Sequence, residues 1–148
     1  MNTRKFAEVV FDILRNAGYH PSLIMGGEMS TQERDEQIEK FRLGKVQVVI
    51  TTDLLARGFD MPTIQLAINF DVPIRNREPE PETYLHRIGR AGRFGTPGIA
   101  VTLFDREEDE AAFWEIIKFF NMKDKVQNLD GGAEQVGTLL DGLKQDDA

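Results

Sequence analysis

The apolar positions of this chain recur at two different spacings, and each spacing predicts one kind of element. Phe6, Val9, Val10, Ile13 and Leu14 follow helical spacing and form one apolar stripe. Gly18 follows them as a natural stop for a helix. The first element predicted is therefore an amphipathic helix that ends near residue 17.

Three more helices are predicted from the residues that begin them. Ser30 with Glu33 forms a capping-box pattern, and Asp105 with Glu108 repeats it. Pro81 is typical of the first turn of a helix. These helices are predicted to run to about residue 43, to about residue 120 and through residues 86–93, respectively.

Short apolar runs between the helices predict strands. The runs cover residues 22–25, 46–50, 65–70 and 98–104, and the second, rich in valine, reads as a buried strand. Strands that alternate with helices indicate an α/β fold with a mostly parallel sheet and helices on both faces. At 148 residues, the chain is expected to form one domain.

Candidate chemistry is concentrated in residues 86–93, which read His-Arg-Ile-Gly-Arg-Ala-Gly-Arg. Arginine stays charged at working pH, and its planar fork matches phosphate oxygens two at a time. On a helix, Arg87 and Arg90, or Arg90 and Arg93, would share a face and converge on one anion. Such a cluster stabilises charge on a transferred phosphoryl group. A solvated basic turn or a generic RNA contact is the alternative interpretation.

Residues 51–60 favour the phosphate interpretation. They place Thr51 and Thr52 at the end of a predicted strand, then Arg57-Gly58 and the carboxylate of Asp60. Hydroxyls at the carboxyl end of a strand suit phosphate and ribose oxygens, and a glycine lets the backbone approach a ligand.

With these two segments in this order, the chain resembles the second RecA-like domain of a DEAD-box RNA helicase. The resemblance runs from about residue 2 to residue 120 and implies a three-layer RecA-like α/β fold. The segments that carry it are Asn2–Lys5, Gly27–Met29, Thr31–Arg34, Thr51–Asp60, Asn69–Pro73 and His86–Arg93.

The resemblance implies that Arg90 and Arg93 are arginine fingers that reach the ATP γ-phosphate on a partner domain. Asp60 would take a ribose hydroxyl and Gly58 would give close backbone approach. The blander alternatives are surface arginines and a turn or capping aspartate. The resemblance also places Arg57, His86 and Arg87 at the interface between the two domains. A buried histidine satisfied inside the fold is the alternative for His86.

For RNA, the resemblance carries over contacts to the sugar-phosphate backbone, which bind without reading sequence. The matching residues are Thr3, Arg4, Gly27, Arg34 and Thr52. Thr31 stands where this motif of the family usually has glutamine, so only Arg34 carries over there. Four aromatic residues, Phe113, Trp114, Phe119 and Phe120, either stack on bases or form the core face of a helix, and the helix explains them better.

A subfamily is indicated by the ten residues between Pro73 and Tyr84, where most DEAD-box proteins have a shorter link. A long link that ends in Glu-Thr-Tyr-Leu-His is similar to the mRNA-export helicases of the nuclear pore. Asp53 departs from that group, which usually has asparagine there. The subfamily implies nuclear-pore mRNA-export factors as partners and a cytoplasmic or nuclear location.

The net charge of −7 changes this interpretation less than its size suggests, because the charge is unevenly distributed. Residues 1–104 carry 13 acidic and 13 basic side chains, whereas residues 105–148 carry 12 acidic and 5 basic ones. RNA contact would then depend on local placement of arginines. The chain has no cysteine, which fits a reducing compartment, and only two histidines, which makes a histidine metal site improbable.

Several features suggest that the chain is part of a longer protein. The apolar strand that precedes Asn2 in the family is missing, and so are a G-x-x-x-x-G-K-[ST] loop and a DEAD-type carboxylate motif. Mg²⁺ would therefore be held by the N-terminal domain, and this domain alone is predicted to be inactive as an ATPase. The helicase domain is predicted over residues 1–128, followed by an acidic, weakly ordered tail over residues 129–148.

Two functions remain open on the sequence alone. The first is the C-terminal half of an ATP-dependent RNA helicase that unwinds short duplexes or remodels RNA–protein complexes. The second is a freestanding, non-catalytic module that binds RNA or a partner with the same fold. A phosphate-binding loop upstream of Met1 would decide for the enzyme.

Overall fold

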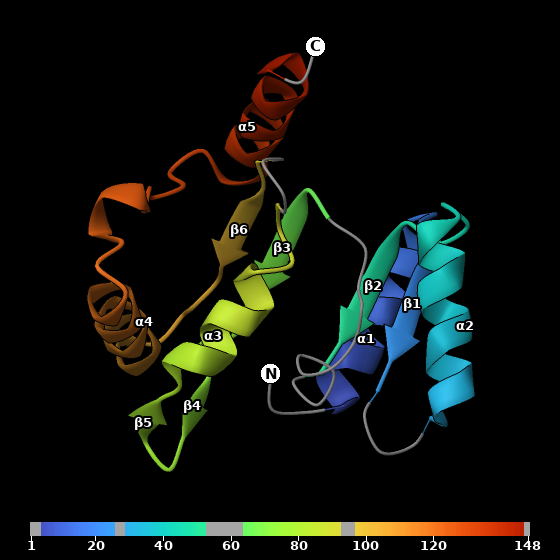
Figure 1. The fold of residues 1–148 in the computed structure, drawn as a ribbon, viewed down its shortest axis with the longest axis horizontal. Coiled ribbons are helices and arrows are strands. Elements are labelled where there is room, and N and C mark those ends of the chain that lie inside the picture. The colour runs from blue at the N-terminus through green and yellow to red at the C-terminus, as the bar shows by residue number, and fades with distance from the viewer. Residues whose placement is uncertain (1–3, 26–28, 53–63, 93–96, 147–148) are drawn as a thin grey trace. The chain divides into compact units, whose positions relative to one another are not determined.

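A computed structural model describes residues 4–25, 29–52, 64–92 and 97–146 (Figure 1). The chain divides into two compact units, Met1–Pro62 and Thr63–Ala148, called here the first and the second unit. Among the described residues, no helix combines the length and the apolar character that crossing a membrane requires.

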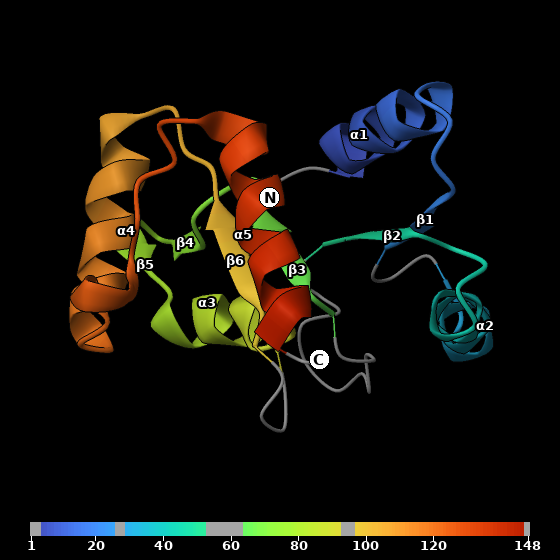
Figure 2. The same ribbon diagram turned by 90° about the horizontal axis from the view of Figure 1, so that it is seen from above.

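The first unit is a helix–sheet–helix arrangement. Its elements are α1 (Arg4–Asn16), β1 (Pro21–Ile24), α2 (Thr31–Arg42) and β2 (Val48–Thr51). The two strands pair in parallel, with Pro21 opposite Val48. The two helices lie on opposite faces of this pair (Figure 2). Ile24 and Ile38 are buried between β1 and α2, so the strand and the helix share one small core.

In the first unit, the end of α1 and the start of α2 confirm the residues that the sequence predicts to stop and start helices. After α1, Gly18 takes a positive φ of 88°, and the amide of Tyr19 donates to the carbonyl of Leu14. This pattern satisfies carbonyls that would otherwise lack a donor. At α2, both bonds of the capping box are present, because the Ser30 hydroxyl accepts from the Glu33 amide and the Glu33 carboxylate accepts from the Ser30 amide. These bonds lower the pKa of Glu33 below its ordinary value of 4.5.

The second unit contains a second parallel strand pair and most of the helices. Its elements are β3 (Leu66–Asn69), β4 (Ile74–Arg75), β5 (Glu78–Pro79), α3 (Pro81–Ile88), β6 (Ile99–Thr102), α4 (Glu107–Phe119), the 3₁₀ helix η2 (Lys123–Lys125) and α5 (Gly132–Asp146). Strands β3 and β6 pair in parallel, with Leu66 opposite Ile99. Along β3, Ala67 and Asn69 are buried and Ile68 is exposed, so the strand alternates between two faces. The predicted α/β class with parallel strands is confirmed.

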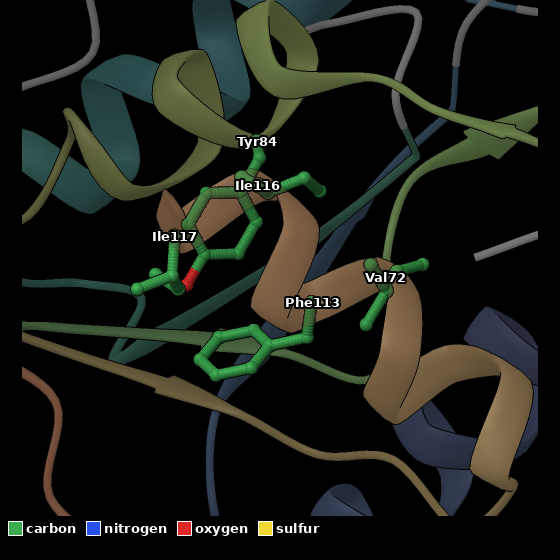
Figure 3. Packing of buried hydrophobic residues seen from close by; sticks show 6 residues of the cluster. Val72, Tyr84, Phe113, Ile116 and Ile117 are labelled. Atoms are coloured by element: carbon green, nitrogen blue, oxygen red, sulfur yellow. The ribbon is translucent and has the colours of Figure 1, made fainter. Parts of the chain in front are cut away.

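The core of the second unit lies between α3 and α4. Val72, Tyr84, Ala112, Phe113, Ile116 and Ile117 form one buried cluster. Figure 3 shows the Tyr84 and Phe113 rings among these side chains, and the two ring centroids are 6.1 Å apart at a steep angle. Trp114 and Phe120 pack against the cluster, whereas Phe119 is 70% exposed. Three of the four aromatic residues on and next to α4 therefore belong to the core, as the helix interpretation predicts.

The start of α4 differs from the prediction. The residue that caps the helix is Arg106, with extended φ and ψ of −115° and 143°, so Asp105 lies one residue too early to act as a cap. Arg106 instead places its guanidinium on Asp109, with Nε 2.9 Å from Oδ2 and Nη2 3.3 Å from Oδ1. Four acidic residues in the first turn suit the positive end of the helix dipole.

Two more elements were not expected from the sequence. The link after Pro73 contains a hairpin of β4 and β5, whose turn residues Asn76 and Arg77 both have positive φ, 52° and 66°. The C-terminal segment forms α5 where a weakly ordered tail was predicted. The helix is explained by its apolar spacing, because Val136, Leu139, Leu140 and Leu143 repeat on one face and are all half-buried.

Candidate functional site

The helix that carries the first part of the arginine-rich segment is fixed to the sheet by buried polar groups. Tyr84 on α3 is 4% exposed, and its hydroxyl lies 3.1 Å from Oγ1 of Thr102 on β6. The same Oγ1 accepts a bond of 3.3 Å from the side-chain amide of Asn69 on β3. Burial raises the pKa of Tyr84 above its ordinary value of 10.0, against the opposing influence of Thr102 and Arg87. The hydroxyl network therefore sets the position of α3 on the strand pair.

Arg87 is the best-defined charged residue of the segment. Its Nη1 donates to the carbonyl of Asp71 at 2.8 Å and lies 3.3 Å from the Asp71 carboxylate. The Arg87 side chain is only 11% exposed and that of Asp71 is 33% exposed. This guanidinium ties α3 to the residues that follow β3. Sequence reasoning missed the pairing, because no local spacing joins residues 16 positions apart.

His86 lies next to Arg87 on α3 but faces away from the protein interior. It is exposed, as is its neighbour Leu85. The alternative of a histidine buried and satisfied inside the fold is therefore excluded. An exposed imidazole on a fixed helix is available to a group that approaches from outside this unit.

Arg90 lies beyond the end of α3, which corrects the expectation of a helix through residues 86–93. The helix ends at Ile88, and Gly89 closes it by donating to the Leu85 carbonyl at 2.8 Å. Arg87 and Arg90 consequently do not share a helical face, and the argument from helical spacing does not apply to them. Four residues beyond Ile88, Gly92 has a positive φ of 75°, a conformation that glycine adopts without strain.

The main chain of the segment after α3 is bonded to Ile64, two residues before β3 begins. The Ile64 amide donates to the Arg90 carbonyl at 3.2 Å, and the Gly92 amide donates to the Ile64 carbonyl at 3.0 Å. Ile64 and Ala91 thereby form a parallel bridge. Ile64 and Ala91 both belong to the second unit, so the bridge ties the main chain beyond the end of α3 to the start of that unit's parallel strand pair.

Three predicted RNA-contact residues lie in the described part of the first unit. Arg4 begins α1, Thr52 follows β2 and is half-buried, and Arg34 lies on α2. The Arg34 guanidinium donates to Oγ1 of Thr31 at 3.2 Å and to the Ser30 carbonyl at 3.4 Å. Thr31, the residue that departs from the family pattern, thus helps to orient Arg34 near the start of the helix.

Six predicted site residues lie outside the described residues. They are Thr3, Gly27, Arg57, Gly58, Asp60 and Arg93. In the part of the chain that the structure describes, no group of three or more histidine and acidic side chains could hold a metal ion.

Comparison with known proteins agrees with this arrangement. The family model described as "Helicase conserved C-terminal domain" matches residues 1–95. The ATP-dependent RNA helicase DBP5 of Saccharomyces cerevisiae is 42% identical over 119 residues, which are 80% of this chain and 24% of that protein. The chain thus spans about a quarter of the length of the curated relatives it matches.

Solved structures of the same group are similar in fold. The C-terminal domain of the DEAD-box protein Dbp5 is 39% identical with a TM-score of 0.77, over 84% of this chain and 68% of that one. S. cerevisiae Dbp5 bound to RNA and ADP BeF3 is 34% identical with a TM-score of 0.81, over 97% of this chain and 37% of that one. A variant of the S. cerevisiae Dbp5 C-terminal domain bound to a Gle1 variant and IP6 is 33% identical with a TM-score of 0.77, over 97% of this chain and 79% of that one.

The parallel α/β fold and the arginine-rich segment that begins on α3 are those of a helicase C-terminal domain with a RecA-like fold. The chain belongs to the DEAD-box family, as one of its C-terminal domains. The resemblance read from the sequence motifs is confirmed, including the similarity to the Dbp5 group.

Proposed function

We propose that this chain is the C-terminal half of an ATP-dependent RNA helicase that unwinds short duplexes or remodels RNA–protein complexes. The observation that carries the proposal is the likeness over 97% of the chain to Dbp5 bound to RNA and ADP BeF3. ATP is the substrate. When it is bound, its γ-phosphoryl group supplies the bond that is hydrolysed, and the residues of this chain bind and orient it.

In this proposal, Arg90 and Arg93 contact the γ-phosphate as arginine fingers and stabilise the charge that develops during transfer. Guanidinium groups suit this role, because each can donate two hydrogen bonds to the oxygens of one phosphate. Asp60 and Gly58 would contact the nucleoside side. Mg²⁺ would be held by the N-terminal domain. The Arg87 guanidinium is bonded to Asp71 within the second unit, and Arg90 lies beyond the end of α3.

The interface with the N-terminal domain would use Arg57 and His86, and Arg87 would support it by fixing α3, because its guanidinium is bonded to Asp71. The exposed position of His86 supports this role, because an exposed imidazole can reach carboxylates of another domain. RNA would contact Thr3, Arg4, Gly27, Arg34 and Thr52 through its sugar-phosphate backbone. Such contacts position RNA without selecting its sequence.

mRNA export at the nuclear pore is the proposed cellular setting, with the location cytoplasmic, nuclear or both. It is supported by the Dbp5 C-terminal domain whose solved structure contains Gle1 and IP6. Binding of the full-length protein to a Gle1-type partner, measured by calorimetry with and without inositol hexakisphosphate, tests this assignment. Absence of binding in both conditions would contradict it.

The arginine fingers are tested in the full-length protein by RNA-stimulated ATP hydrolysis. Arg90→Ala should lower kcat by on the order of 10³-fold, within the range of arginine fingers in phosphoryl transfer. Arg42→Ala is the matched control, because Arg42 pairs with Glu39 on an exposed face and both side chains are 51% exposed. Its activity should equal that of the wild type.

Two outcomes would overturn the proposal. Wild-type kcat in both Arg90→Ala and Arg93→Ala would show that these arginines do not contact the reacting phosphate. A full-length protein that binds RNA but hydrolyses no ATP would favour the non-catalytic module with the same fold. The isolated chain serves as a blank in this assay, since it is predicted to have no turnover.

A further inference from the structure

The Arg90–Gly92 segment and the start of β6 attach to two consecutive residues, Ile64 and Gln65. Ile64 bonds through its amide and its carbonyl to Arg90 and Gly92, at 3.2 and 3.0 Å. The next residue, Gln65, accepts a bond of 2.9 Å from the amide of Ile99 in β6. The residue before Ile99 is Gly98, which therefore lies where these main-chain segments converge.

Gly98 has no room for a side chain. A Cβ at this position would lie 2.4 Å from the carbonyl carbon of Ala91, 2.4 Å from the Gly92 nitrogen and 2.9 Å from the Ala91 oxygen. All three atoms belong to the main chain, so they cannot rotate away as the end of a flexible side chain would. Gly98 is not among the glycines with positive φ. The reason for glycine here is close approach of two backbones.

An alanine at this position would displace the Ala91–Gly92 peptide. Ordinary contact of a Cβ begins at 3.4 Å, so the backbones would have to separate by about 1 Å. The bond from Ile64 to Arg90 is already 3.2 Å long, and a further shift of this size breaks it. The residue displaced with it is Arg90.

We propose that Gly98 is a positioning residue for Arg90, because its missing side chain lets the start of β6 hold the Arg90 carbonyl on the Ile64 amide. The inference rests on the proposed function only for the consequence in catalysis. Displacement of a catalytic group by 1 Å can reduce the rate by about 10²-fold. The structural part of the inference is tested separately.

The structural arm uses the 148-residue chain and amide hydrogen exchange. In Gly98→Ala, exchange of the Ile64 and Gly92 amides should accelerate, whereas the amides of α4 should stay as protected as in the wild type. The single tryptophan, Trp114, packs against the core of the second unit and reports through its fluorescence that this core remains folded. Unchanged exchange at Ile64 and Gly92 would overturn the proposal, whatever the enzyme assay gives.

The kinetic arm uses the full-length protein and RNA-stimulated ATP hydrolysis. Gly98→Ala should lower kcat by roughly 10–100-fold and leave the KM for ATP within about twofold, because an arginine finger acts mainly in the transition state. Gly142→Ala is the control, since Gly142 in α5 has nothing within 4 Å of an added Cβ. It should leave kcat and exchange unchanged.

Together, the two assays distinguish the positioning role of Gly98 from the catalytic role of Arg90. Faster exchange with a normal kcat in Gly98→Ala, but a low kcat in Arg90→Ala, would overturn the positioning role. Faster exchange with a normal kcat in both variants would instead contradict the proposed function of Arg90. If Gly98→Ala loses its Trp114 signal, Ile64→Pro replaces it, because proline removes the amide that donates to Arg90. A wild-type kcat in Ile64→Pro would overturn the proposal.

Discussion

Replacement of Arg87 by alanine should destabilise the second unit, although arginine is usually a surface residue. The Arg87 side chain is 11% exposed and donates to both the carbonyl and the carboxylate of Asp71. Hydrogen bonds to charged groups contribute about 1.5–3 kcal/mol each. Asp71 is 33% exposed, so water can solvate its carboxylate again in the variant and recover part of the loss. We expect a loss of about 2–3 kcal/mol in the free energy of unfolding, which includes the packing of the Arg87 alkyl stem.

Urea unfolding followed by Trp114 fluorescence measures this loss, because Trp114 packs against the cluster that contains Tyr84 of α3. The melting temperature should fall by about 5–10 °C for a chain of this size. Arg87→Lys should lose less, since lysine keeps the charge but not the fork geometry. Asp71→Asn keeps both carbonyl oxygens and should also lose less.

A double-mutant cycle with Arg87→Ala and Asp71→Ala isolates the pair from other effects. The coupling should exceed about 1 kcal/mol, well above the value for exposed ion pairs. A loss below about 0.5 kcal/mol in Arg87→Ala would refute the reasoning. The guanidinium would then be a surface group, and the Asp71 contact would not hold α3.

Three further results are expected. Arg34→Ala should weaken the binding of all single-stranded RNAs about equally. Fluorescence titration should show that the slope of log affinity against log salt falls by roughly one phosphate contact. A changed sequence preference at unchanged slope would contradict backbone contact. Arg77→Gly should stabilise the chain by about 0.5–1 kcal/mol in urea unfolding, because the relieved left-handed strain exceeds the added chain entropy; lower stability would show that the Arg77 side chain has a structural role. The raised pKa of Tyr84 means that the folded state holds this proton more tightly, so stability should be complete below pH 10 and decline as the pH rises above it. Tyr84→Phe should remove this decline, and an equal decline in that variant would assign it to other groups.

The parts of the fold that could be predicted are those fixed by local chemistry. Ser30 and Glu33 mark the start of α2, Pro81 marks the start of α3, and Gly18 marks the end of α1, because each satisfies or avoids a backbone group within a few residues. Their positions follow from short-range geometry that the sequence displays directly.

The parts that could not be predicted depend on partners distant in sequence or on unusual residues. Arg87 and Asp71 are in contact although they lie 16 positions apart in the sequence, and no periodicity predicts such a pair. The hairpin turn has Arg77 at a position with positive φ, where glycine is the residue that predicts a turn. The sequence pattern therefore did not predict the hairpin. The helical interpretation of residues 86–93 overlooked Gly89, which closes α3 before Arg90. The predicted roles at the nucleotide and RNA remain predictions.

The bridge between Ile64 and Ala91 has a consequence for how the protein can be mapped by mutagenesis. The two hydrogen bonds of the bridge use only main-chain atoms, so alanine at position 64 leaves both donors and acceptors in place. An alanine scan would therefore show no effect at Ile64, although its main chain holds the segment beyond α3. Substitutions at Ile64 and Ala91 would be tolerated for the same reason. At Gly98, by contrast, even the methyl group of alanine would collide with the main chain.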